Sequence, residues 1–298
     1  GHDGVCLVAE TPVPGPCRIE DYAIIGDCET AALVSRDGSI DWLCWPRFDS
    51  DACFAALLGG PEHGRWRIGP SEPGARASRR YRGDTLILET RFETADGCVE
   101  IVDFMPVGGK AAGMNSDIVR IVRGTRGRMP MSMQLVLRFD YGSVVPWVSR
   151  LRDGRLCAIA GPDMVTLRTG VDFHGEHLTS VSDFVVSEGD EECFVLTWSP
   201  SHLEPRTPVD PLPALASTER FWEEWAARCT CGGEWRKSVM RSLLTLKALT
   251  YGPTGGIVAA PTTSLPEQIG GARTWDYRFC WLRDATLTLL ALMDGGYV

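Results

Sequence analysis

The segment MSMQLVLRF, residues 131–139, decides the fold class, because apolar side chains occupy every second position along it. A period of two residues is the pattern of a β-strand with one face in a core. Similar short runs, divided by turn residues such as Asp-Gly, lie at residues 86–93, 98–104, 118–122, 156–160, 164–168, 179–186 and 193–198. Many short strands with regularly spaced turns predict an antiparallel β-sandwich.

The N-terminal part of this region contains a hairpin signal. Two apolar runs, residues 31–35 and 39–45, flank Arg36-Asp37-Gly38. An Asp-Gly pair between apolar runs is typical of a tight β-turn. Before it, residues 1–17 hold three prolines and little periodicity, which predicts a loose lead-in.

The pattern changes near residue 200. Five prolines between Pro200 and Pro213 predict a stiff linker. Helical periodicity follows at residues 214–228, where Ser217 is the capping candidate, and at 234–251 and 282–293, with a long loop at 252–274. We therefore predict a lead-in at 1–17, a β-sandwich at 18–205, a linker with a helix at 206–233 and a helical domain at 234–298. Helices joined by a long loop cannot bury both apolar faces alone, so the last domain is expected to be incomplete.

Composition and charge exclude several classes of function. The formal net charge is −9 and no basic run exceeds Arg79-Arg80, which argues against nucleic-acid binding. No stretch of 18 apolar residues and no signal-like start is present, so we expect no membrane span and a cytoplasmic protein. A homo-oligomer is an alternative that the sequence leaves open.

The eleven cysteines form no Cys-x-x-Cys pair, and the five histidines show no metal-ligand spacing. Reduced, mostly buried thiols are the simplest interpretation, and we expect neither a metal nor a cofactor. A redox or metal protein is the alternative.

Residues 273–284, RTWDYRFCWLRD, hold two Trp, a Tyr, a Phe, three Arg and two Asp. Aromatic faces stack on pyranose rings, and Arg and Asp make directional hydrogen bonds to sugar hydroxyls. The same residues are also typical of ordinary packing and of a solvated helix start. Composition alone leaves both interpretations open.

Two blocks resemble glycoside hydrolase family 15, which includes glucoamylases, glucodextranases and some microbial trehalases. The first active-site block of that family is similar to residues 261–267 together with 275–285. Residues 19–45, followed by Pro46-Arg47-Phe48-Asp49-Ser50, resemble the trehalase-like β-sandwich domain that precedes the catalytic domain in bacterial members. The resemblance covers residues from about 18 to the end.

The resemblance implies a β-sandwich followed by the first helices of a truncated (α/α)6 barrel. It further implies that Arg283 and Asp284 bind the hydroxyls of a terminal glucose, and that Trp281 and Tyr277 line the same subsite. Glu267 is expected to be structural. Neither catalytic glutamate of the family matches a position of this sequence, so no catalytic residue is assigned and the chain alone is expected to be inactive.

The function implied is inverting hydrolysis of terminal α-linked glucose, in trehalose or in α-1,4- or α-1,6-linked oligosaccharides. The resemblance to the trehalase-like domain slightly favours trehalose, and the linkage stays open. The alternative is a non-catalytic carbohydrate-binding or interaction module built on the sandwich.

Overall fold

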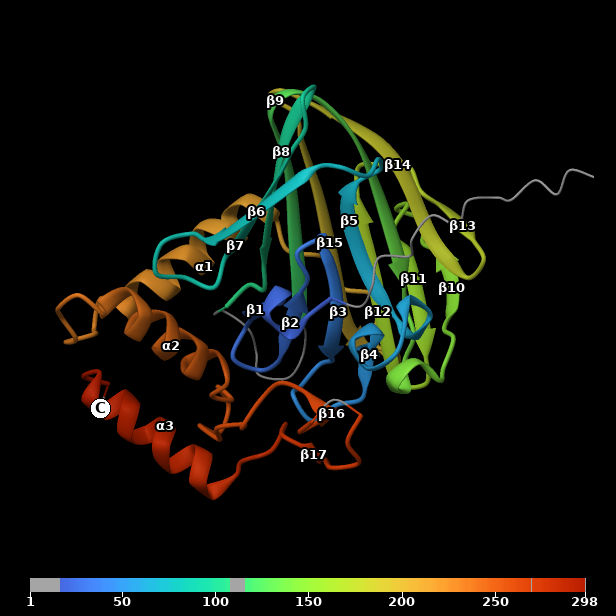
Figure 1. Ribbon diagram of the computed structural model, residues 1–298. Coiled ribbons are helices and arrows are strands. Elements are labelled where there is room, and N and C mark those ends of the chain that lie inside the picture. The colour runs from blue at the N-terminus through green and yellow to red at the C-terminus, as the bar shows by residue number, and fades with distance from the viewer. Residues whose placement is uncertain (1–16, 108–115, 269, 298) are drawn as a thin grey trace, which may run out of the picture.

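The computed structural model describes residues 17–107, 116–268 and 270–297. The predicted lead-in, residues 1–17, lies outside the described residues except for Cys17. Fifteen strands, β1 to β15, form one antiparallel network, and three helices lie beside it (Figure 1). The large antiparallel β-rich region expected from the alternating runs is therefore confirmed.

The strands of this network are short apart from β9. They are β1 (Ala23–Gly26), β2 (Ala31–Val34), β3 (Ser39–Cys44), β4 (Ala52–Phe54), β5 (Arg65–Pro70), β6 (Arg76–Tyr81), β7 (Leu88–Glu93), β8 (Gly97–Phe104), β9 (Ser116–Val136), β10 (Trp147–Arg150), β11 (Leu156–Ala160), β12 (Asp163–Thr169), β13 (His174–Glu176), β14 (Thr179–Ser187) and β15 (Glu191–Pro200). The predicted β2–β3 hairpin is present, with Leu33 opposite Trp42.

Strand β9 connects two layers. Its first half pairs with β8 and β15, and its second half pairs with β5 and β14. The sequence predicts two separate strands here, 118–122 and 131–139, and that prediction is wrong. Exposed residues around Gly127 interrupt the apolar alternation, but Gly127, with φ of 58°, bends the strand and does not end it.

The main core lies between the two layers. It combines residues of the β1–β3 and β5 side with residues of β7, β8, β12 and β15. Its large, fully buried members include Trp66, Phe54, Phe194, Ile40 and Leu43. A buried ion pair crosses this region: Arg120 Nε donates to Asp103 Oδ1 over 2.8 Å, and its other nitrogens donate to the carbonyls of Trp66 and Gly38. Every charge there is compensated, as a buried ion pair requires.

The helices are α1 (Pro211–Ala226), α2 (Arg236–Ala248) and α3 (Leu282–Asp294). Helix α1 begins at Pro211, three residues before the predicted start, because proline is tolerated in a first helical turn. Ser217 is therefore not its cap, and its hydroxyl donates to the carbonyl of Ala214 inside the helix. Helix α2 is shorter at both ends than the predicted 234–251.

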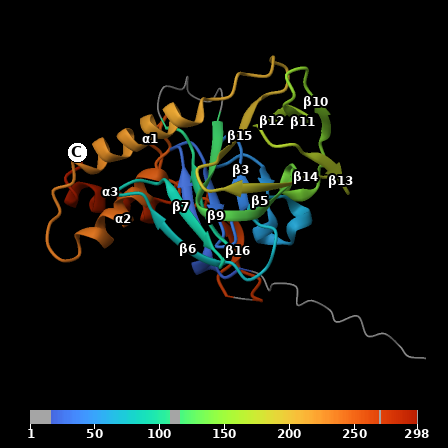
Figure 2. The same cartoon turned by 90° about the horizontal axis from the view of Figure 1, so that it is seen from above.

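Helices α1 and α2 pack on the sheet. Trp222, Met240 and Leu244 share a buried cluster with Leu86. Arg241 of α2 donates to the carbonyl of Thr85 over 2.7 Å, which ties the helix to the β6–β7 connection. Figures 1 and 2 show both helices along one side of the sheet.

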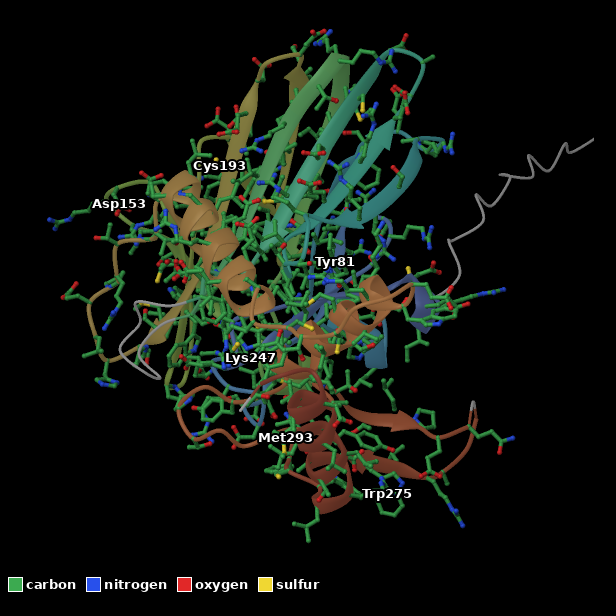
Figure 3. All side chains as sticks on the ribbon, turned by 90° about the vertical axis from the view of Figure 1, so that its left-hand side faces the viewer. Tyr81, Asp153, Cys193, Lys247, Trp275 and Met293 are labelled. Atoms are coloured by element: carbon green, nitrogen blue, oxygen red, sulfur yellow. The ribbon has the colours of Figure 1, made fainter. Side chains whose placement is uncertain are left out.

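Helix α3 lies further from the sheet, and one of its faces is exposed. Leu282 is 86% exposed, and Leu287, Leu289, Leu290 and Met293 are each more than half exposed. Figure 3 shows Met293 of α3 and Trp275 at the same end of the molecule. No helix in the described part of the chain has the length and apolar composition that a bilayer span needs.

The predicted loop at 252–274 contains a short hairpin. Strands β16 (Thr263–Pro266) and β17 (Thr274–Asp276) pair antiparallel through Thr263 and Asp276. Runs of three and four residues are too short for an alternation to be recognised in the sequence. We call residues 273–284 the aromatic block. The hairpin lies next to the C-terminal end of β3, where Arg278 of the aromatic block contacts Cys44.

Candidate functional site

Three aromatic side chains meet at the start of α3. The rings of Tyr277 and Trp281 stack with centroids 5.9 Å apart, and Trp275 meets Trp281 edge-on at 6.4 Å. The Trp281 indole N–H donates to the carbonyl of Asp276 over 3.1 Å, which fixes its orientation. We call Trp275, Tyr277 and Trp281 the aromatic cluster. It offers the partly exposed ring faces that a sugar requires.

Arg278 attaches this block to the sandwich. Its guanidinium forms a bidentate ion pair with the Asp276 carboxylate, at 2.9 Å and 2.8 Å. It also donates to the carbonyl of Ser50 over 2.7 Å. Burial, the largest single influence, opposes the charge on Arg278, but the hydrogen bond with Asp276 and the neighbouring Cys44 and Tyr141 together outweigh it, and the pKa of Arg278 rises. The same hydrogen bond lowers the pKa of Asp276. Arg278 is thus a buried structural link.

Further hydrogen bonds hold the loop against the strands. The Trp42 indole N–H donates to the carbonyl of Pro261 over 2.7 Å. The backbone N–H of Gly252 donates to the carbonyl of Cys28 over 2.6 Å. The start and the middle of the 252–274 segment are therefore both fastened to the sandwich, and an ordered loop of this kind can hold a site in place.

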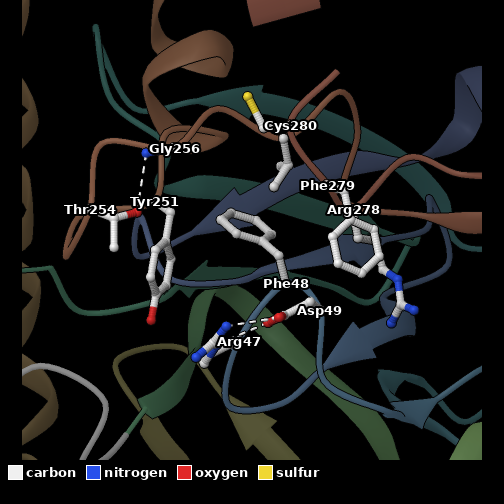
Figure 4. A pocket seen from close by; sticks show the side chains of 10 residues that line it. Arg47, Phe48, Asp49, Tyr251, Thr254, Gly256, Arg278, Phe279 and Cys280 are labelled. Carbon is white, nitrogen blue, oxygen red and sulfur yellow. Dashed lines mark hydrogen bonds and ion pairs between the residues drawn. The ribbon is translucent and has the colours of Figure 1, made fainter. Parts of the chain in front are cut away.

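A cavity of about 200 Å³ lies between the two sequence blocks (Figure 4). Arg47 and Asp49 line it from the β3–β4 loop, and they form an ion pair at 2.8 Å. Tyr251 lines it from the loop that follows α2, with its ring centroid 5.4 Å from the Arg47 guanidinium. Phe279 closes another wall. The lining combines ring faces with charged donors and acceptors, as sugar sites do.

Arg283 and Asp284 lie on the first turn of α3 and bind each other, at 3.2 Å. The side chain of Arg283 is 74% exposed and that of Asp284 35%. The helix dipole favours the Asp284 carboxylate at this position. Of the four predicted residues, the structure thus brings Tyr277 against Trp281 and Arg283 against Asp284. Within the described residues, no hydrogen bond or ring contact joins one pair to the other.

Glu267 accepts a hydrogen bond from the Trp275 indole N–H over 2.7 Å. This contact is compatible with the structural role predicted for Glu267, since it supports the aromatic cluster.

Sequence reasoning missed Arg278, Arg47, Asp49 and Tyr251 as lining or anchoring residues. Arg278 and Arg47 each belong to a block that we singled out, and each follows or precedes an Asp by two residues. That spacing is a signal for a local ion pair. The contact between residues 46–50 and the segment 275–285 cannot be predicted from the local sequence of either.

The described residues hold no group of three His, Cys, Asp or Glu side chains suited to a metal ion. The ten cysteines among them are all free, and burial raises the pKa of several thiols, Cys44 to about 12. The expectation of neither metal nor cofactor stays a prediction.

The chain matches two family models. Residues 13–197 match the family described as "Trehalase-like, N-terminal", and residues 233–298 match "Glycosyl hydrolases family 15".

Curated relatives cover nearly the whole chain. A protein named "Trehalase" from Mycolicibacterium smegmatis is 36% identical over 322 residues, which is 97% of this chain and 48% of the relative. A "Trehalase" from Mycobacterium tuberculosis is 33% identical, covering 99% of this chain and 47% of the relative. A "Trehalase" from Thermoplasma volcanium is 32% identical over the same shares of the two chains. The chain spans about half the length of these relatives.

Proposed function

Because the chain belongs to the trehalase-like N-terminal family and continues into a segment of glycosyl hydrolase family 15, we propose that it serves hydrolysis of terminal α-linked glucose. Trehalose is the first candidate substrate, since the matched relatives are named trehalases. Short α-gluco-oligosaccharides are the second. The observation that carries the proposal is the aromatic cluster with its neighbouring Arg and Asp side chains, held rigidly on the sandwich inside the segment that matches family 15.

We assign the terminal glucose to the start of α3. Trp281 and Tyr277 supply the ring face on which the pyranose stacks, and Arg283 and Asp284 supply donors and acceptors for its hydroxyls. The exposure of Arg283 leaves most of its five N–H donors available. Binding of a neutral sugar is also compatible with the acidic net charge of the chain.

The reaction we propose proceeds with inversion at the anomeric carbon. One carboxylic acid protonates the glycosidic oxygen while a second carboxylate, roughly 6.5–9.5 Å away, activates a water on the opposite face. We assign neither carboxylate to a residue of this sequence. The chain alone is accordingly expected to bind sugar without cleaving it.

We further propose that α2 and α3 are the first helices of an (α/α)6 barrel. The exposed face of α3 supports this, because it carries five large apolar side chains of the kind that neighbouring helices cover. The domain boundaries at 18–205, 206–233 and 234–298 remain a prediction that belongs to this proposal. A cytoplasmic location also remains a prediction.

Glucose release from trehalose, maltose and isomaltose tests the function. We expect no release by the 298-residue chain, and release of β-glucose, seen by NMR before mutarotation, by a protein extended to the length of its relatives. Cleavage by the 298-residue chain would show that the acid pair lies within it. An extended protein that cleaves none of the three would favour the alternative, a carbohydrate-binding or interaction module on the sandwich.

A further inference from the structure

A surface on the sandwich carries an exposed indole beside two adjacent cavities. Trp147 begins the edge strand β10, and its side chain is 80% exposed. It lines a cavity of about 280 Å³ between β10, the end of β9 and the β13–β14 turn. A second cavity of about 430 Å³ shares Arg138 and Thr179 with the first. We call Trp147 with these two cavities the β10 surface. Figures 1 and 2 place β10 and β13 on the side of the sheet away from α1, α2 and α3.

Arg138 is a buried cation without a counter-charge. It is 8% exposed, and one of its terminal nitrogens donates to the carbonyls of Leu137 at 2.7 Å and Leu178 at 3.2 Å. Among the residues that the structure describes, no carboxylate lies within ion-pair distance of it. Burial alone lowers the pKa of Arg138, with no acidic neighbour to oppose it. Its remaining guanidinium donors border the two cavities, where a ligand can reach them.

Arg65 lines the second cavity and is in a similar position. One terminal nitrogen donates to the side-chain oxygen of Gln134 over 2.6 Å, while its Nε is buried without an acceptor in the described structure. Glu62 and Glu176 line the same cavity, and their ion-pair contacts are with neighbouring histidines and not with the arginines. Two cations and two carboxylates thus face one hollow. This balance of donors and acceptors fits a neutral polyhydroxyl ligand better than an anion.

The turn that forms the rim of the β10 surface is strained. His177 and Leu178 have φ of 46° and 61°, and they join β13 to β14 as a two-residue hairpin loop. Such loops favour Asn and Gly, because other residues tolerate left-handed backbone poorly. The strain places the Leu178 side chain on the rim of the first cavity. Strained backbone of this type clusters at binding sites.

Self-association through β10 is the competing explanation, since Trp147, Val148 and Leu178 are exposed and apolar at a sheet edge. It accounts for the apolar rim. It leaves the free donors of Arg138 and Arg65 without a role. Trp147 offers a stacking face at the first cavity, Arg138 lines both cavities, and two carboxylates line the second. Together they supply the ring face and the hydrogen-bond partners that a carbohydrate requires.

We propose that the β10 surface is a second carbohydrate-binding site, in which a neutral glucosyl unit stacks on Trp147 and its hydroxyls bond to Arg138 and Glu176. The aromatic and polar arrangement indicates the sugar, whereas the choice of an α-glucan rests on the proposed function. The site would hold a chain of glucosyl units at a distance from the aromatic cluster.

Affinity electrophoresis tests the proposal with the 298-residue chain. Native gels are run with and without soluble amylopectin, and the same samples are titrated with maltoheptaose. We expect amylopectin to retard the protein, and Trp147→Ala to weaken the retardation at least tenfold. Trp235→Ala is the matched control, because Trp235 is another exposed indole, at the start of α2, and its removal should change nothing. Arg138→Met should also weaken binding, with thermal unfolding as the check on its folding.

Each other outcome overturns the proposal. If amylopectin does not retard the wild type, or retards Trp147→Ala as much as the wild type, the proposed site does not exist. Retardation by polygalacturonate and not by amylopectin would show an anion site. A dimer in sedimentation velocity that Trp147→Ala dissociates, without sugar binding, would assign the surface to contact between copies.

A separate variant distinguishes this proposal from the proposed function. Because the proposed function also places sugar binding at the start of α3, Trp147→Ala is measured in the Arg283→Ala background as well as in the wild type. Trp147→Ala should weaken the retardation in both. If Arg283→Ala abolishes retardation and Trp147→Ala does not, the sugar binds at the start of α3, and the second site is refuted while the proposed function stands.

Discussion

At the scale of the residue, Arg278 connects the candidate site to the rest of the protein. It bonds to Asp276 two positions away and to Ser50, which is 228 positions away. The first contact follows from local spacing. The second depends on the fold, and it makes the aromatic block a part of the sandwich surface. Substitutions of Asp276 and Arg278 should therefore lower the stability of the fold.

Asp276→Asn should lower the free energy of unfolding at pH 7 by about 2 kcal/mol, the scale of a hydrogen bond to a charged group. The folded-state pKa of Asp276 is depressed, mainly by the hydrogen bond from Arg278, so its contribution is present above about pH 4 and is lost as the pH falls through the folded pKa. Urea unfolding at pH 7 and at low pH measures this.

The wild type and Asp276→Asn should therefore converge in stability at low pH. Asp153→Asn is the control, because Asp153 also pairs with an arginine but lies on the surface, where solvent screens the pair. A difference of equal size at both pH values would contradict the assigned ion pair.

Arg283→Ala should reduce kcat/KM at least about a hundredfold in a catalytically complete protein, on the order of 3 kcal/mol of transition-state binding. The reason is the loss of donors to the terminal glucose. Arg273→Ala, an exposed arginine of the same segment, serves as control and should retain activity. A loss below about threefold for Arg283→Ala would refute the assignment.

At the scale of the element, β9 decides how the layers are joined. Its first half belongs to one layer and its second half to the other, with Gly124 and Gly127 near the crossing. A Cβ on Gly124 would collide with the carbonyl of Ser187. The close approach of the two backbones at this point thus requires glycine.

Gly124→Ala should lower the free energy of unfolding by about 2 kcal/mol, since backbone atoms must move to relieve the overlap. Gly175→Ala is the matched strand control, because a Cβ there meets open space. Denaturant unfolding of both variants measures the difference. Equal stability of Gly124→Ala and the wild type would show that the strands separate easily at this crossing.

At the scale of the whole molecule, the sandwich is well covered and the helical part is not. Helices α1 and α2 bury aromatic and aliphatic side chains against the sheet, while α3 exposes a row of leucines. An exposed apolar face of this extent is a typical site of association.

The protein should bind a hydrophobic dye such as ANS strongly or self-associate. The double variant Leu287→Gln with Leu290→Gln should remove at least half of the dye fluorescence. Leu212→Gln, a comparably exposed leucine on α1, should change it little. A monomeric protein that binds no dye would contradict an exposed α3 face.

The sequence by itself determined the elements that depend on neighbours along the chain. Alternation of apolar residues located most strands, because a strand repeats every two residues, and 3.6-residue periodicity located the three helices to within a few residues. The cluster of Tyr277 and Trp281 was also predictable, since a short segment holds both.

Only the tertiary structure decided what lies together from distant parts of the chain. The continuity of β9, the bond from Arg278 to Ser50 and the cavity between Arg47 and Tyr251 all join residues whose separation carries no periodic signal. The same holds for Trp147 and Arg138, which share a cavity through strand pairing. The packing of a sheet depends on the whole chain. It brings together site residues whose proximity cannot be predicted from a local sequence pattern.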